Sequence, residues 1–157
     1  IYFIKGKEIS FTKKTFERLK KKVGIDIDKI TFLDPMTTKE YINHCGRASV
    51  LLDPFYFGAG NSFHESMFYG TPTISKPNQF MRSKIVEGAY KQMKIEEPPI
   101  FKSLDEYVHK AIEFANFSPK KILETKKYFS KCADENLFEN KEVIKDFHNT
   151  LLNIIKK

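Results

Sequence analysis

Short apolar runs alternate along this chain with segments in which apolar residues recur every three or four positions. The runs IYFIK (1–5), KITFLD (29–34), SVLLD (49–53) and TPTIS (71–75) have the length and composition of strands. Strands that alternate with helices in this way are typical of a parallel sheet covered by helices. The pattern therefore predicts an α/β fold.

Helical periodicity occurs between and after these runs, with recognisable end signals. Thr37 and Glu40 form the pattern T-x-x-E of a capping box, and Gly70 follows a periodic segment as a glycine stop. The predicted helices of this part of the chain cover 12–23, 38–47, 62–69 and 80–94.

The chain changes character after residue 102. Ser103 and Glu106 repeat the capping-box pattern, Ser118 precedes a first-turn proline, and an apolar stripe marks a last helix. We therefore expect a helical tail over 103–157 that packs on the α/β part, and about 45% helix in the whole chain.

Length and composition are those of one globular domain. The 157 residues, 41% of them hydrophobic, supply one sizeable core, so we expect a single domain over 1–157. Cys45 and Cys132 lie far apart without metal-type spacing and are predicted to be free thiols in a reducing compartment, with the cytoplasm as the expected location. No apolar run approaches the roughly 20 residues that span a bilayer, so no membrane span is expected.

The net charge of +7 permits attraction to phosphate-bearing partners. The basic residues are scattered over helices, and the basic run at 13–22 is interpreted as a solvated helix face. No zinc-finger spacing, RNA-binding aromatic motif or arginine-rich arm accompanies them. We therefore predict neither a nucleic-acid partner nor a metal site.

The segment GAGNS, between two aromatic runs, is the strongest candidate for a binding loop. Gly58 and Gly60 remove side chains, so the amides of Gly60, Asn61 and Ser62 are predicted to face a diphosphate where the next helix begins. Glu65, one turn further on, is placed to accept the hydroxyls of a ribose. The alternatives are an ordinary glycine turn and a capping box from Ser62 to Glu65, neither of which needs a ligand.

The loop DPMTTKEYINH follows the second predicted strand and offers a second set of candidates. Ligands of parallel sheets bind outside the carboxyl ends of the strands, where adjacent strands would place both loops side by side. Tyr41 and His44 share one helix face and are suited to stacking on and hydrogen bonding a base, whose edge the backbone near Met36 would read. Alternatively, Tyr41 is a half-buried amphipathic residue and His44 is solvated surface.

These segments resemble one family when taken together. FLDPMTTKEYINHCGRASVLLDPFYFGAGNSFHESMFYGTPTI is similar to the nucleotide-sugar half of GT-B glycosyltransferases, within them the O-linked N-acetylglucosamine transferase and SPINDLY-like group. The motif order of that group appears as EYINHCGRASVLLD, then FGAGNSFHESMFYGTPTI, then Met81-Arg82-Ser83. The tail around 104–108 resembles the closing helices of the group, so the resemblance covers about 29–157.

The resemblance implies a Rossmann-like domain that forms the C-terminal half of a GT-B fold. It implies a UDP-sugar donor, transfer of an N-acetylhexosamine or hexose to a protein acceptor, and no required metal or other cofactor. By position, Gly60, Asn61 and Ser62 would hold the diphosphate and Glu65 the ribose. The full set of implied donor-binding residues is Met36, Tyr41, His44, Gly58, Gly60, Asn61, Ser62 and Glu65.

This sequence departs from the family pattern in places. Gly58-Ala59-Gly60 replaces three glycines, Ser62 replaces threonine, and Ser49 stands where aspartate is common. The acceptor site and the catalytic base are expected from segments before Ile1, so no catalytic residue is assigned here. The chain is expected to be an inactive fragment of a two-domain enzyme.

Two other functions remain open at this point. One is a stand-alone phosphate- or nucleotide-binding module without transfer activity, and the other is a GT-B enzyme that uses a GDP- or ADP-sugar and a small acceptor. Arg82 also has two interpretations, as a brace of the cleft near the sugar or as a partner in a surface salt bridge.

Overall fold

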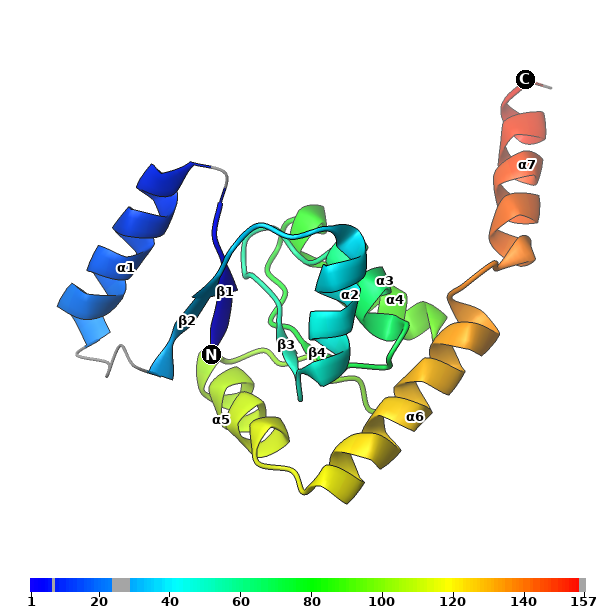
Figure 1. Ribbon diagram of the computed structural model, residues 1–157. Coiled ribbons are helices and arrows are strands. Elements are labelled where there is room, and N and C mark those ends of the chain that lie inside the picture. Colours follow the sequence, from blue (N-terminus) through cyan, green and yellow to red (C-terminus); the bar gives the residue numbers. More distant parts are fainter. Residues whose placement is uncertain (7, 24–28, 156–157) are drawn as a thin grey trace. The chain divides into compact units, whose positions relative to one another are not determined.

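The computed structural model describes residues 1–6, 8–23 and 29–155. It is a mixed α/β structure with short parallel strands and a helical tail, as the sequence predicts (Figure 1). Helix accounts for 59%, more than the expected share, in part because the first helix begins three residues before its predicted start. The chain forms two compact units, Ile1–Tyr41 and Ile42–Lys157.

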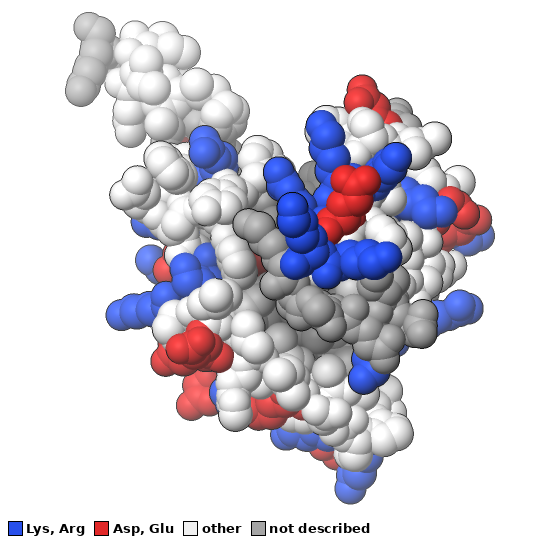
Figure 2. All heavy atoms as spheres, turned by 90° about the vertical axis from the view of Figure 1, so that its left-hand side faces the viewer, with Lys and Arg blue, Asp and Glu red and all other residues white. Residues whose placement is uncertain are grey.

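The first unit holds one strand pair and one helix. Strand β1 (Tyr2–Ile4) pairs in parallel with β2 (Thr31–Leu33), and α1 (Ile9–Val23) lies between them in sequence. The Phe32 ring lies 5.7 Å from the Phe3 ring and 6.0 Å from the Phe16 ring, so aromatic side chains join the helix to the strands. Lys and Arg side chains gather on the face that contains α1 (Figure 2).

The sequence signal at the start of α2 (Thr38–Arg47) is confirmed. The Thr37 amide donates to Glu40 Oε2 over 2.8 Å, and the Glu40 amide donates to Thr37 Oγ1 over 3.3 Å, which completes the predicted capping box. Near the end of α2, the Cys45 carbonyl accepts a 2.7 Å hydrogen bond from the buried Thr71 hydroxyl. Cys45 and Thr71 both belong to the second unit, so this bond lies within that unit.

The second unit contains β3 (Leu51–Leu52) and β4 (Thr73–Ile74), which pair in parallel with Leu51 opposite Thr73. An isolated bridge joins Ser75 to Ile100 on the other side of β4. Among the described residues, the strand ladders form two separate two-stranded pairs. Both predicted strands of this unit are therefore present, in shorter form.

Helices surround the core of the second unit. These are α3 (Asn61–Met67), the short 3-10 helix η2 (Met81–Ser83), α4 (Ile85–Gln92), α5 (Leu104–Ala115) and α6 (Pro119–Asn136), and α7 (Lys141–Ile155) follows them in the chain without contributing to the core. The core comes mainly from α3, α4 and α6, and includes Phe63, Met67, Val86, Tyr90, Met93, Phe129 and Ala133. Helix α7 has no buried residue among those described.

The tail begins as its sequence predicts. The Glu106 amide donates to Ser103 Oγ over 3.1 Å and the Ser103 amide donates to Glu106 Oε2 over 3.2 Å, a complete capping box at the start of α5. The hydrogen bonds that the Ser103 amide and hydroxyl donate to the Glu106 carboxylate lower the pKa of that carboxyl. Ser118 accepts a hydrogen bond from the Lys121 amide and precedes Pro119, the first residue of α6.

Three further features concern the cysteines, membrane-spanning helices and metal-binding groups. Cys45 and Cys132 are both free cysteines, as predicted. In the part of the chain that the structure describes, no helix combines the length and apolar character needed to cross a bilayer. In that same part, no group of three or more His, Cys, Asp or Glu side chains is arranged to hold a metal ion.

Candidate functional site

The predicted binding loop leaves β3 and leads into α3. Gly60 is the residue before the helix, and no side chain caps it. The alternative interpretation of Ser62 to Glu65 as a capping box is therefore wrong, since the helix begins at Asn61 and Ser62 lies inside its first turn. The Gly60 carbonyl instead accepts the first helical hydrogen bonds, including one of 3.1 Å from the Phe63 amide.

Three consecutive amides of this loop are free. Among the described residues, the N–H groups of Gly60, Asn61 and Ser62 have no hydrogen-bond acceptor. An added Cβ at Gly60 would have no atom within 4 Å, so open space lies beside that residue. Unpaired amides next to open space are suited to binding an anion, because each donor still has its full hydrogen-bonding capacity.

Gly58 has a different environment from Gly60. It is buried, its amide donates to the Arg82 carbonyl over 2.8 Å, and an added Cβ would lie 3.3 Å from that carbonyl oxygen. A glycine is favoured here because two backbone segments approach closely. Gly58 therefore packs the loop against the segment at Arg82, and its predicted contact with a donor stays a prediction.

Asp53 organises this loop and was missed by sequence reasoning. Its side chain is 3% exposed, Oδ1 accepts a 2.6 Å hydrogen bond from the Ala59 amide, and Oδ2 accepts one from the Ser75 hydroxyl. Tyr107 on α5 donates to the Asp53 carbonyl over 3.3 Å. Burial raises the pKa of the Asp53 carboxyl, and the hydrogen bonds that it accepts from the Ser75 hydroxyl and the Ala59 amide partly offset this rise. The sequence signal that could have identified Asp53 is its position as an acidic residue directly after an apolar strand.

The side chain predicted to bind ribose lies on the same element as the free amides. Glu65 is half-buried on α3, one turn into the helix. In the described part of the chain, its carboxylate forms no hydrogen bond or ion pair, and neither do the side chains of Asn61 and Ser62. Three polar side chains without protein partners thus accompany the three free amides.

The residues predicted to bind the base are divided between the two units. Met36 and Tyr41 belong to the first unit, whereas His44 belongs to the second. Tyr41 is half-buried and His44 is exposed on α2. This burial is what the alternative interpretation expects, in which Tyr41 is an amphipathic helix residue and His44 is solvated surface. Their contact with a base stays a prediction.

Arg82 connects two segments beside the loop. Its Nε donates to the Tyr56 carbonyl over 3.0 Å, and its guanidinium carbon lies 4.7 Å from the centre of the Phe80 ring. Among the described residues it forms no salt bridge, so that interpretation is not supported. Together with the bond from Gly58, this contact fixes the residues that precede the free amides.

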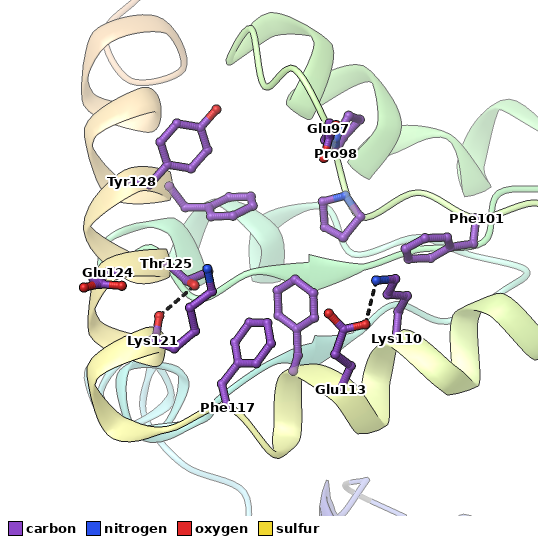
Figure 3. A pocket seen from close by; sticks show the side chains of 13 residues that line it. Glu97, Pro98, Phe101, Lys110, Glu113, Phe117, Lys121, Glu124, Thr125 and Tyr128 are labelled. Carbon is purple, nitrogen blue, oxygen red and sulfur yellow. Dashed lines mark hydrogen bonds and ion pairs between the residues drawn. The ribbon is translucent and has the colours of Figure 1, made fainter.

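A hollow of about 520 Å³ lies elsewhere in the second unit, between α5, α6 and the segment 97–101. Figure 3 shows its aromatic walls, with Phe117 opposite Phe101, and charged side chains among them. Lys110 and Glu113 form a 2.6 Å ion pair there, and Lys121 Nζ lies 5.8 Å from the Phe117 ring centre. None of the predicted donor-binding residues lines this hollow.

Comparisons with known proteins give one kind of match. No protein-family model matches the sequence, and no curated protein matches it. Among solved structures, a mutant of the O-GlcNAc transferase of Thermobaculum terrenum is similar over 94% of this chain, with a TM-score of 0.78 and 12% sequence identity. This chain covers 29% of that chain. The similarity shows the fold, which is consistent with half of an O-GlcNAc-transferase-like GT-B structure.

Proposed function

We propose that this chain is the nucleotide-sugar-binding half of a glycosyltransferase that modifies a protein acceptor. The observation that carries the proposal is the group of unpaired amides at Gly60, Asn61 and Ser62, beside open space. The similarity of the fold to an O-GlcNAc transferase supports it. These amides would bind the diphosphate of a UDP-sugar.

The other donor contacts follow from the chemistry of the side chains. The unpartnered Glu65 carboxylate would accept hydrogen bonds from the ribose hydroxyls, since an ionised carboxylate accepts without donating. Gly58 would contribute by keeping the loop closely packed. The proposed contacts to uracil are Met36, Tyr41 and His44.

The proposed role in catalysis is stabilisation of the leaving group. Negative charge grows on UDP as the sugar departs, and fixed amide donors stabilise that charge without having to reorganise. One well-placed donor contributes roughly 3 kcal/mol in sites of this kind. The acceptor site and the catalytic base are assigned to segments outside these 157 residues, so transfer by this chain alone is not expected.

The chain is expected to be stabilised by UDP in preference to GDP, ADP or inorganic phosphate. A ligand at about one hundred times its dissociation constant adds roughly 2.7 kcal/mol to the free energy of unfolding, which a thermal shift detects. Gly60→Val is expected to weaken UDP binding by roughly tenfold or more, because its side chain would occupy the open space beside Gly60.

Gly88→Val is the matched control for this variant. An added Cβ at Gly88 also has no atom within 4 Å, but Gly88 lies on α4. UDP binding that survives Gly60→Val unchanged would contradict the proposed site. An equal response to every phosphate would favour a general phosphate-binding module, and a preference for GDP or ADP would favour a different nucleotide sugar.

Glu65→Gln is expected to weaken UDP binding by about tenfold while leaving the binding of inorganic phosphate unchanged. The substitution keeps the size of the side chain but removes the charge that strengthens hydrogen bonds from the ribose hydroxyls. Titration calorimetry with UDP and with phosphate measures both effects. Glu87→Gln, at an exposed glutamate on α4, is the control, and an equal loss of both ligands would refute the ribose assignment.

A further inference from the structure

Asp53 joins three segments of the second unit at one buried carboxylate. It follows β3, accepts a hydrogen bond from Ala59 in the loop, and accepts another from Ser75 directly after β4. Tyr107 of α5 adds a bond to its backbone carbonyl. Asp53 is nine-tenths or more buried; its bond from Ser75 is buried, and its bond from Ala59 is partly buried.

Stability alone does not explain a carboxylate at this position. Burying an ionised group costs free energy, and an asparagine would offer a similar shape and the same acceptor to Ala59 at lower cost. Burial accordingly raises the pKa of Asp53. A carboxyl with a raised pKa contributes stability that is present below its unfolded-state pKa and is lost as the pH rises through its folded-state pKa. The raised pKa means that the ionised form of Asp53 stabilises the fold less than the protonated form does.

The titratable groups that interact with Asp53 do not neutralise this charge. They are the phenols of Tyr90 and Tyr107, and burial raises the pKa of both, to about 12 for Tyr107. Both phenols are uncharged at pH 7. Among the described residues, the contacts that remain to the carboxylate are its hydrogen bonds from the Ala59 amide and the Ser75 hydroxyl.

The amides of the loop divide into two sets. Those of Gly58 and Ala59 are turned into the protein, toward the Arg82 carbonyl and the Asp53 carboxylate. The next three amides in the sequence are unpaired. A charge-assisted bond to Ala59, about twice as strong as a neutral one, fixes the backbone immediately before the unpaired set.

We propose that Asp53 is a positioning residue, whose carboxylate holds Ala59 so that the amides of Gly60, Asn61 and Ser62 remain free and aligned for a diphosphate. This role rests on the proposed function. Asp53 itself does not contact the ligand. Preorganised donors bind an anion more tightly than mobile donors, because the ordering cost has already been met in folding.

The test compares Asp53→Asn with the original chain in three measurements. In the absence of ligand, amide hydrogen exchange at Ala59 is expected to become about tenfold faster, because its acceptor loses its charge. UDP affinity is expected to fall about tenfold for the same reason. Thermal stability at pH 7 is expected to stay equal or to rise, because a buried charge is removed. A residue with only a structural role would lower stability instead.

Ser75→Ala provides a second variant. It removes the donor to Oδ2 and leaves the Ala59 bond in place, so it is expected to change exchange at Ala59 and UDP affinity less than Asp53→Asn does. If Asp53→Asn does not fold, Ser75→Ala is expected to loosen the loop measurably, since it leaves the carboxylate held at one oxygen only. Unchanged exchange at Ala59 in that case would overturn the proposal.

The outcomes separate this inference from the proposed function. If the unsubstituted chain does not bind UDP, the proposed function is contradicted. Amide exchange at Ala59 in Asp53→Asn still reports whether Asp53 orders the loop in that case. Unchanged exchange in a folded Asp53→Asn overturns the positioning role. Increased UDP affinity also overturns it, because the charge would then act only by repelling the diphosphate.

Discussion

Replacing Gly70 with alanine is expected to abolish the folding of the second unit. Gly70 has a positive φ of 63°, and an added Cβ would lie 1.9 Å from the carbonyl oxygen of Lys126 and 2.7 Å from the amide nitrogen of Ser130. Both contacts are with the backbone of α6, so no side-chain rotation relieves them. Because α6 would have to move away from the core, we expect a loss of more than about 4 kcal/mol.

Circular dichroism and urea denaturation measure this effect. Gly88→Ala is the control, since Gly88 lies in α4 and an added Cβ there has no atom within 4 Å. Alanine at a helical position is expected to raise stability by up to about 1 kcal/mol. A Gly70→Ala protein with native unfolding behaviour would show that α6 does not pack on this turn as described.

Tyr90→Phe is expected to lower the free energy of unfolding by about 3 kcal/mol. The Tyr90 side chain is fully buried, and its hydroxyl accepts a 2.7 Å hydrogen bond from the Thr73 amide and donates one of 3.0 Å to the Thr73 carbonyl. The hydroxyl thus acts at β4 as a neighbouring strand would. Phenylalanine keeps the ring packing but leaves both backbone groups of Thr73 unpaired in the core, where each costs roughly 1–3 kcal/mol.

Urea denaturation of this variant is best compared with that of Tyr56→Phe. Tyr56 is 74% exposed, and its carbonyl, which the substitution retains, is the group that accepts from Arg82. The control is expected to change stability by less than about 0.5 kcal/mol. Equal stability of the two variants would mean that the Tyr90 hydroxyl does not support β4.

The two S-x-x-E patterns show how far local sequence determines structure. Ser103 and Glu106 form the predicted capping box, whereas Ser62 and Glu65 do not. The pattern is the same in both places, but the chain before Asn61 is held by a bond from Gly58 to the distant Arg82 and by one from Ala59 to Asp53 at the end of β3. These bonds start the helix one residue earlier, and no local pattern contains that information.

The candidate site was predicted only in part for the same reason. The glycines and small polar residues of GAGNS identified the loop, because a glycine-rich segment between a strand and a helix is a local feature. That Gly60 faces open space and Gly58 faces the Arg82 backbone depends on residues more than twenty positions away. Asp53 was missed because its role exists only when Ala59 and Ser75 are folded around it.

The sequence by itself determined the α/β alternation, the positions of most helices and strands, and the capping boxes at Thr37 and Ser103. Each of these depends on propensities or hydrogen bonds within a few residues of the chain. Only the tertiary structure decided which amides of the loop remain free, why Gly70 must be a glycine, and that Asp53 is buried. Those properties arise from contacts between segments that are distant in sequence, and packing and hydrogen bonding in the folded interior select them.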